Sequence, residues 1–209
     1  MANTEKTHQQ VWDEIYRGRP GKTSGQPGKM LAQHTADLPP GRALELGCGK
    51  GDDAVWLATR GWQVTAVDLS DLALAHGRDN AEAAGVAERV TFVRHDLAET
   101  FPEGQFDLVT SCFMQSPVAF PRAEVLRRAT GAVAPGGHLL IIEHGSRSPW
   151  SSAAPDTHFP TPQETLADLA LDREGWRQLV VDATPRTARG PDGQVAEVAD
   201  NVILVRRIR

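Results

Sequence analysis

Short apolar runs alternate with amphipathic segments along most of this chain of 209 residues. A short run of apolar and β-branched residues predicts a buried strand, whereas apolar residues that recur with the helical period predict a helix. The expected strands span residues 43–46, 63–67, 90–94, 106–111, 138–143, 176–183 and 201–207, and the expected helices span 11–16, 30–38, 52–59, 71–84, 122–132 and 163–171. Asp52 or Asp53 is suited to cap the helix at 52–59 and Ser70 the helix at 71–84, and the stretch at 185–193 is rich in turn residues.

This order of elements predicts an α/β fold. Strands that are joined through helices run parallel and are covered by helices on both faces of the sheet. No helix is expected between the last two strands, so these should form an antiparallel pair. We therefore expect a Rossmann-like, doubly wound fold: a mainly parallel seven-stranded sheet with an antiparallel last strand and helices on both faces.

Composition and charge exclude several classes of protein. Hydrophobic residues make up 40% of the chain and charged residues 23%, which is typical of a globular protein rather than a disordered or membrane-embedded one. The net charge of −5 provides no global attraction to nucleic acid. Two cysteines are too few for a secreted disulfide framework, and no signal peptide or transmembrane run is visible. We expect a cytoplasmic protein without nucleic-acid or membrane partners, acting as a monomer or a homodimer.

The segment ALELGCGKG at residues 43–51 carries the strongest chemical signal. Gly47, Gly49 and Gly51 follow an apolar strand at alternate positions, directly before an expected helix. Glycine lets the backbone turn tightly and approach a ligand, and the N-terminus of a helix attracts an anionic group. Asp68, at the end of the second strand, is placed to bind ribose hydroxyls. The combination predicts a nucleoside cofactor.

Five segments in order resemble the class I S-adenosylmethionine-dependent methyltransferases. They are ELGCGKG at 45–51, VTAVDLS at 64–70, FVRHDL at 92–97, FDLV at 106–109 and APGGHLLI at 134–141. WDEIY at 12–16 and RGW at 60–62 are similar to the small-molecule branch of tellurite-resistance and thiopurine methyltransferases. Many members of that branch carry a tryptophan in the loop that here reads KTSGQPG, at 22–28, so the resemblance does not imply a shared substrate. The resemblance implies a methyltransferase domain at 41–209, preceded by an N-terminal helical lid and loop at 1–40.

The resemblance also implies roles for individual residues in binding S-adenosyl-L-methionine. The glycines would approach its methionine and ribose, Glu45 its ammonium group, Asp68 its ribose, and Asp96 the exocyclic amine of its adenine. As alternatives, Asp68 and Asp96 would only cap the helices that follow them, and both cysteines would only fill space. The full expected set is Glu45, Gly47, Cys48, Gly49, Gly51, Asp68, Leu69, Asp96, Leu97 and Cys112.

Transfer of a methyl group requires alignment of the acceptor and exclusion of water, and it requires a general base only for a protonated acceptor. The candidate bases after the fifth strand are Glu143, His144 and His158. Aromatic residues suited to wall a small-molecule pocket are Trp12, Tyr16, Phe113, Trp150 and Phe159. The histidines show no metal-ligand spacing, so no metal is expected. The acceptor atom, whether oxygen, nitrogen, sulfur or a heavier chalcogen, stays open.

Two other functions are compatible with parts of the sequence. GKGDDA at 49–54 fits the dinucleotide-binding pattern of an NAD(P)-dependent oxidoreductase. Against this reading, Tyr16 is the only tyrosine, so the chain has no Tyr-x-x-x-Lys pair. A non-catalytic protein that binds S-adenosylmethionine or S-adenosylhomocysteine would share the glycine motif, and only turnover of an acceptor distinguishes it from an enzyme.

Overall fold

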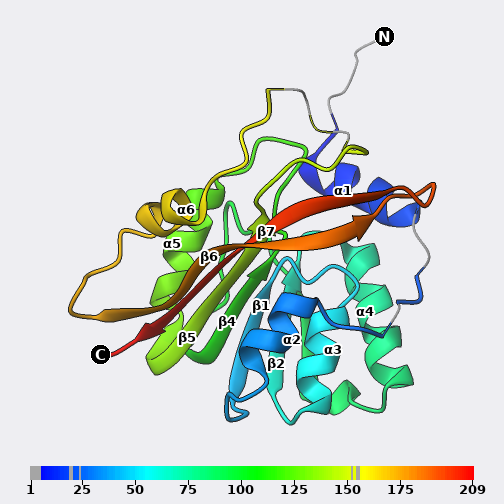
Figure 1. The fold of residues 1–209 in the computed structure, drawn as a ribbon. Coiled ribbons are helices and arrows are strands. Elements are labelled where there is room, and N and C mark those ends of the chain that lie inside the picture. Colours follow the sequence, from blue (N-terminus) through cyan, green and yellow to red (C-terminus); the bar gives the residue numbers. More distant parts are fainter. Residues whose placement is uncertain (1–5, 19–20, 24, 152, 154–155) are drawn as a thin grey trace. The chain divides into compact units, whose positions relative to one another are not determined.

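The computed structural model describes residues 6–18, 21–23, 25–151, 153 and 156–209 (Figure 1). The chain divides into two compact units, Met1–Phe106 and Asp107–Arg209, which are described in turn. Its seven strands have the order β3-β2-β1-β4-β5-β7-β6. No helix within the described residues is long and apolar enough to cross a membrane.

The first unit contains three parallel strands and the helices that cover them. In β1 and β2, Leu46 is paired with Val67, and in β2 and β3, Asp68 is paired with Arg94. Both strand ends that carry the expected cofactor residues therefore lie at the same edge. The elements are α1 (His8–Arg17), α2 (Lys29–Thr35), β1 (Arg42–Leu46), α3 (Asp52–Thr59), β2 (Gln63–Asp68), α4 (Asp71–Ala83), the 3-10 turn η1 (Ala87–Arg89) and β3 (Val90–Arg94).

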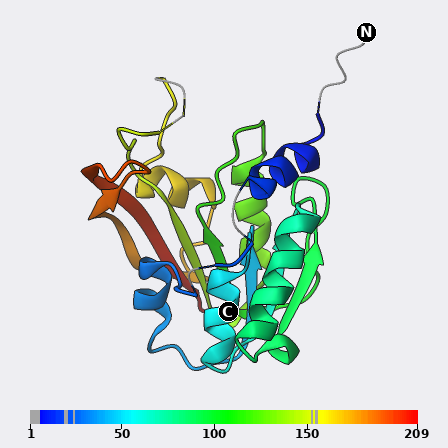
Figure 2. The same cartoon turned by 90° about the vertical axis from the view of Figure 1, so that its right-hand side faces the viewer.

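The core of this unit forms because β1 and β2 are apolar on both faces, as in most parallel sheets. Leu44, Leu46 and Val67 are completely buried, and α3 buries Leu57 against them. Helix α4 packs on β3 at Gly77, where a Cβ atom would lie only 2.5 Å from the ring of Phe92. Helix α1 lies beside α4 in both views (Figures 1 and 2).

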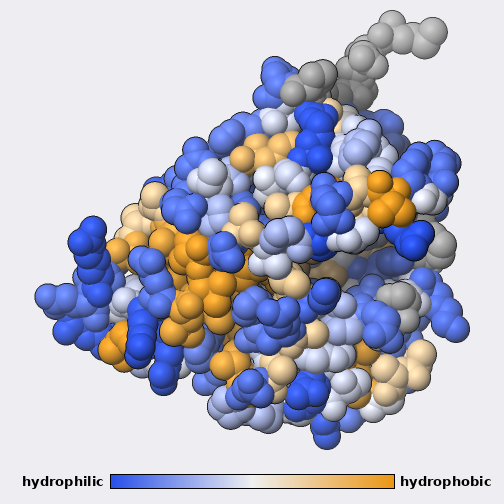
Figure 3. Space-filling model, in the orientation of Figure 1, coloured by the Kyte–Doolittle hydropathy of each residue, from blue (hydrophilic) through white to orange (hydrophobic). Residues whose placement is uncertain are grey.

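The second unit is built on a long antiparallel hairpin. Strand β7 runs antiparallel to both of its neighbours, β5 and β6, as Figure 1 shows. Much of β6 is exposed, including Leu179 at 43%, and Figure 3 shows apolar residues gathered on this side of the hairpin. The elements are β4 (Phe106–Cys112), α5 (Arg122–Gly131), β5 (Val133–His144), α6 (Pro162–Asp168), β6 (Trp176–Arg189) and β7 (Val195–Arg207).

The expected fold class is confirmed: the sheet has seven strands, and the last strand is antiparallel. Three strand boundaries were predicted wrongly, in β5, in β6 and in β7, the last of which begins at Val195 rather than at residue 201. Strand β5 begins at Val133 rather than at residue 138, with Gly136 inside it at a φ of 83°. Strand β6 continues to Arg189 through a stretch that was expected to be turn-rich. Pairing with β7 stabilises this stretch, which has no strand pattern of its own.

The start of α3 also differs from the expectation. Asp52 and Asp53 were expected to cap this helix, but the N-cap is Gly51, which has a φ of 77° and makes no side-chain cap. The two carboxylates lie in the first helical turn instead, where their negative charges interact favourably with the positive end of the helix dipole.

Candidate functional site

The glycine loop of the first unit depends on positive backbone φ angles. Gly49 has a φ of 53°, and a Cβ atom on it would lie 2.9 Å from the hydroxyl oxygen of Tyr16. Gly51 has a φ of 77°, and its Cβ would lie 2.9 Å from the Phe92 ring. Any other residue would be strained and would collide with a buried neighbour at both positions. The loop therefore closes tightly only because these positions are glycine.

Asp68 holds the glycine loop in place. One carboxylate oxygen accepts a hydrogen bond from the N–H of Gly49 at 2.9 Å, and the other accepts one from the N–H of Ser70 at 2.9 Å. Burial raises the pKa of Asp68, while these N–H donors act in the opposite direction. Each carboxylate oxygen has a second lone pair, so Asp68 retains the capacity to accept hydrogen bonds from a ligand.

Glu45 lies completely inside the unit beside other acidic residues. It accepts a hydrogen bond from the N–H of Ala54, and its Oε2 atom is buried with no hydrogen-bond partner among the described residues. Burial, and next the charges of Asp53 and Asp68, raise the pKa of Glu45 well above its ordinary value. A buried carboxylate without a donor is costly, and a cationic group would relieve that cost.

Helix α1 is anchored beside this loop. The hydroxyl of Ser70 hydrogen-bonds to the carboxylate of Asp13, and the same hydroxyl oxygen accepts from the N–H of Ala73 as the N-cap of α4. Tyr16 is buried, and its ring lies 6.1 Å from that of Trp12. Helix α1 thus brings Tyr16 to the glycine loop at Gly49, with Trp12 beside Tyr16.

The other predicted cofactor residues of the first unit lie on the loops after β1, β2 and β3. Asp96 accepts a hydrogen bond from the N–H of Ala98 at 3.0 Å and so stabilises the turn that follows β3, where no helix begins. Leu97 is buried and Leu69 is half-buried. Burial raises the pKa of the Cys48 thiol well above its ordinary value, so this side chain is a protonated, space-filling thiol.

In the second unit, the residues after β4 and β5 come together. Phe113 has a φ of 53°, which is rare for a residue with a side chain, and its ring lies 4.6 Å from the ring of His144. The N–H of His144 donates to Oε1 of Gln115 at 3.2 Å. Cys112, the residue before Phe113, is half-buried. Phe113 and His144 were both predicted for the site, and the structure places them in contact.

His144 faces a charged pair on the neighbouring strands. Its Nδ1 atom lies 4.0 Å from Oδ1 of Asp200, a buried atom without a hydrogen-bond partner among the described residues. Arg186 Nε donates to Oδ2 of Asp200 at 2.5 Å. Burial lowers the pKa of His144; Asp200 and Glu143 act in the opposite direction and Arg186 in the same direction. The lowered pKa favours the neutral form of the His144 imidazole.

Glu143 does not fit the role of a base. It is completely buried and forms an ion pair with Arg122. Its Oε1 atom accepts from the hydroxyl of Thr165 at 2.6 Å and from the side-chain amide of Asn201 at 3.1 Å. The carboxylate is thus held by α5, α6 and β7, and its role is to connect these elements to β5.

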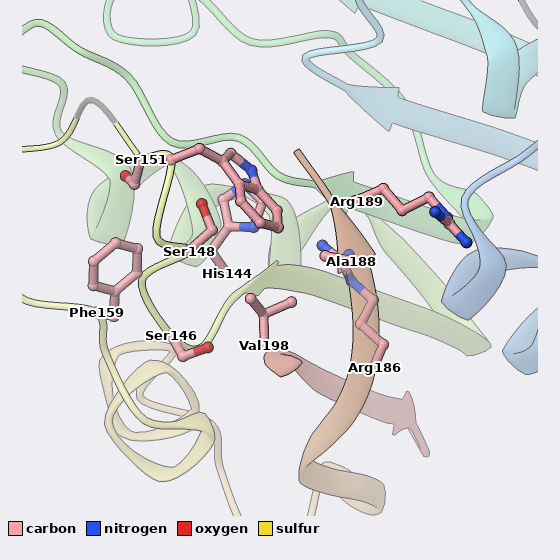
Figure 4. Close-up of a pocket in the computed structure, with 10 residues that line it drawn as sticks. His144, Ser146, Ser148, Ser151, Phe159, Arg186, Ala188, Arg189 and Val198 are labelled. Carbon is pink, nitrogen blue, oxygen red and sulfur yellow. The ribbon is translucent and has the colours of Figure 1, made fainter. Parts of the chain in front are cut away.

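A pocket of about 280 Å³ opens beside His144. Figure 4 shows the lining side chains, among them the apolar ring of Phe159, and the lining also includes the aromatic residue Trp150. His158 lies outside this lining, with a side chain that is 71% exposed and an Nε2 atom 3.5 Å from Glu164. The lining consists of His144, Ser146, Ser148, Trp150, Ser151, Phe159, Arg186, Ala188, Arg189 and Val198.

Sequence reasoning missed the half of this pocket that comes from the β6–β7 hairpin. Arg186 and Ala188 lie in the stretch that was expected to be a turn, so they were not considered. Asp200 is paired with His144 across β5 and β7. That pairing depends on the register of the strands. In the sequence, the position of Asp200 just before the apolar run of β7 is a weak indication of it.

Comparison with known proteins identifies related domains. Residues 43–137 match a family described as "Methyltransferase domain". The chain is 31% identical over 144 residues to the 27-O-demethylrifamycin SV methyltransferase of Amycolatopsis mediterranei, covering 66% of this chain and 50% of the relative. The chain thus spans about half the length of this curated relative.

Solved structures share the fold of this chain. A structure from a study of the conversion of a disulfide bond into a thioacetal group during echinomycin biosynthesis has a TM-score of 0.73 and 26% identity, covering 95% of this chain and 92% of the other. A methyltransferase from Geobacter sulfurreducens in complex with S-adenosyl-L-homocysteine has a TM-score of 0.59 and 24% identity, covering 81% and 72%. The second likeness shows the fold alone. The narrower similarity to the tellurite-resistance and thiopurine branch stays a prediction.

Proposed function

This chain belongs to the class I S-adenosylmethionine-dependent methyltransferases, and on that premise we propose that it methylates a small-molecule acceptor. The observation that carries the proposal is the buried, unpartnered Oε2 atom of Glu45 beside the glycine loop. A cationic ligand that also carries a ribose and a carboxylate satisfies the donors and acceptors found there.

The residues of the first unit fit S-adenosyl-L-methionine group by group. Glu45 receives the ammonium group, because its pKa is raised in the absence of a cation and its Oε2 atom lacks a donor. The N–H groups at the start of α3 suit the carboxylate of the ligand. Asp68 accepts from the ribose hydroxyls with its remaining lone pairs, and Asp96, Leu69 and Leu97 border the adenine.

The pocket of the second unit provides the acceptor site. The cofactor supplies an activated methyl group when it is bound, so the protein has only to orient the acceptor and remove its proton. His144 accepts that proton at Nε2, because its Nδ1 atom faces Asp200 and its lowered pKa keeps it neutral. Trp150 and Phe159 exclude water on the apolar side.

The cofactor assignment is tested by calorimetry and thermal unfolding with S-adenosylmethionine, S-adenosylhomocysteine and NAD. Ligand at about 100 times its dissociation constant adds about 2.7 kcal/mol to the free energy of unfolding. We expect this stabilisation from both adenosyl compounds and none from NAD. Asp68→Asn should weaken binding by about 1–3 kcal/mol, whereas the exposed Asp71→Asn serves as the control and should not. Stabilisation by NAD alone would contradict the proposal.

The base assignment is tested by transfer of a labelled methyl group to hydroxyl and thiol acceptors. His144→Asn should lower kcat for a hydroxyl acceptor by about 10²–10⁴-fold and should affect a thiolate acceptor much less. His138→Asn is the matched control, because His138 also lies on β5 and also has a lowered pKa, caused mainly by burial. Equal losses in both variants would remove His144 from the proposal. Cofactor binding without transfer to any acceptor would instead indicate a binding protein.

A further inference from the structure

The pocket beside His144 is rich in hydrogen-bond donors. The Oγ atom of Ser146 accepts from the N–H of Ala199 at 2.8 Å, and that of Ser151 accepts from the N–H of Ala153 at 3.2 Å. A serine hydroxyl whose oxygen already accepts a backbone hydrogen bond still has its hydrogen to donate. These two hydroxyl groups therefore face a ligand as donors.

The charge of the lining is positive. Arg186 and Arg189 both line the pocket, and none of the described lining residues is acidic. The nearest carboxylate is Asp200, which is buried behind the surface and fixes Arg186 through its Nε atom. The terminal amino groups of Arg186 remain to bind a ligand, and the side chain is 32% exposed. When His144 is uncharged, Arg186 and Arg189 contribute two positive charges to the pocket, and Asp200 behind it contributes one negative charge.

The two arginines differ in direction. Figure 4 shows Arg186 directed toward the other lining side chains, whereas Arg189 extends away from Phe159 and His144. Arg186 is also the one whose guanidinium plane is fixed by a hydrogen bond. A guanidinium that is already oriented loses little entropy when it binds a carboxylate through two parallel hydrogen bonds.

Another part of the lining is apolar. Trp150 packs closely on Gly190, where a Cβ atom would lie 2.7 Å from the Trp150 ring. The guanidinium of Arg147 lies 5.9 Å from the centre of the Phe159 ring. Val198 and Ala188, both buried, complete this wall from β7 and β6. A flat apolar body fits between such surfaces.

Building on the proposed function, we propose that the acceptor is a small carboxylate, with an aromatic or similarly flat body against Trp150 and Phe159 and its carboxylate on Arg186. The serine hydroxyl groups of Ser146 and Ser151 donate to the same anionic group or to the body it is attached to. His144 then faces the hydroxyl or thiol that is methylated.

The test uses two probes of similar shape, the anionic 4-hydroxybenzoate and the uncharged 4-hydroxybenzamide. Their binding is measured by calorimetry with the full chain saturated with S-adenosylhomocysteine. We expect a dissociation constant of about 1 mM or tighter for the acid, and binding of the amide weaker by about tenfold or more. Arg186→Gln should abolish this preference. Arg177→Gln removes the same charge from an exposed position on the same strand and should retain it.

Because Arg186→Gln leaves Asp200 without its partner, the double variant Arg186→Gln/Asp200→Asn removes both charges and should also lose the preference. Equal binding of the two probes, tighter binding of the amide, no binding of either, or a preference retained in the double variant overturns the inference. Saturation with S-adenosylhomocysteine is measured first, so that a failure of the proposed function shows as lack of cofactor binding. A failure of this inference alone shows as cofactor binding without discrimination between the probes.

Discussion

At the scale of single residues, the glycine loop depends on backbone conformation and on the space beside it. Gly49 and Gly85 share a positive φ, at 53° and 69°. A Cβ on Gly49 would meet the Tyr16 hydroxyl at 2.9 Å, whereas one on Gly85 would meet nothing within 4 Å. Alanine substitutions at these two glycines therefore separate the effect of a strained backbone conformation from the effect of a steric collision.

Gly49→Ala should abolish measurable binding of S-adenosylhomocysteine, because the new methyl group displaces Tyr16 from the loop. Gly85→Ala should lower the free energy of unfolding by about 1–2 kcal/mol through the left-handed conformation and leave binding unchanged. Urea denaturation and calorimetry check both expectations. Full affinity in a folded Gly49→Ala protein would exclude the loop from the cofactor site.

The raised pKa of Glu45 leads to a pH dependence of cofactor binding. In the free protein, burial disfavours the ionised carboxylate, and a bound cation favours it. Below the raised pKa, binding of S-adenosylmethionine should therefore release a proton, and the affinity should rise with pH until it levels off above that pKa. Calorimetry in two buffers of different ionisation enthalpy measures the released proton. Glu45→Gln should bind more weakly and release none, and an unchanged proton release would contradict the assignment.

At the scale of elements, α1 is held to the cofactor unit by the residue that also caps α4. The Ser70 hydroxyl binds Asp13 of α1 and accepts from the N–H of Ala73. In the second unit, Thr161 caps α6 by the same chemistry, accepting from the N–H of Glu164 at 3.2 Å. Ser70 both caps α4 and anchors α1, whereas Thr161 caps α6 through its hydrogen bonds with Glu164, so the two residues form a matched comparison.

Ser70→Ala should cost about 1 kcal/mol of stability and should also weaken binding of S-adenosylhomocysteine, because Tyr16 loses the anchor of its helix. Thr161→Ala should cost a similar amount of stability and leave that binding unchanged. Denaturation gives the first quantity and calorimetry the second. Equal affinities in the two variants would show that α1 does not contribute to the cofactor site.

At the scale of the whole molecule, each unit has its own buried polar centre. In the second unit, Glu143 connects β5 to α5 through Arg122, to α6 through Thr165 and to β7 through Asn201. Removal of the negative charge of Glu143 would leave the guanidinium of Arg122 without an ionic partner, and breaking a buried ion pair in this way is strongly destabilising.

Glu143→Gln should therefore lower the free energy of unfolding by about 3–5 kcal/mol, measured in urea. The exposed Glu124→Gln on α5 is the control and should change it by less than about 0.5 kcal/mol. Loss of methyl transfer with unchanged stability in Glu143→Gln would restore Glu143 as a candidate base.

Much of the fold and of the cofactor site was predictable because the signals are local. Apolar runs and helical periodicity located every strand and helix, and Ser70 identified the start of α4. The errors in β5 and β6 occurred where the sequence contains Pro135-Gly136-Gly137 or Pro185, residues that favour turns. In β6, strand pairing with β7 outweighs the local preference. In β5, the pairing with β7 begins only at His138, and the side chains of Arg206 and Arg207 donate to the carbonyl groups of Gly136 and Val133.

By itself, the sequence determined the order of elements, the glycine loop and the acidic residue after β2, because each follows from neighbouring residues and from the φ angles that glycine alone adopts freely. Tertiary structure decided the pocket beside His144. Asp200 and Arg186 reach that histidine through the register of β5, β7 and β6, which is set by pairing between distant segments. Burial, likewise, is a property of the folded chain. It leaves the Oε2 atom of Glu45 without a hydrogen-bond partner among the described residues, and it encloses Glu143 among its structural partners.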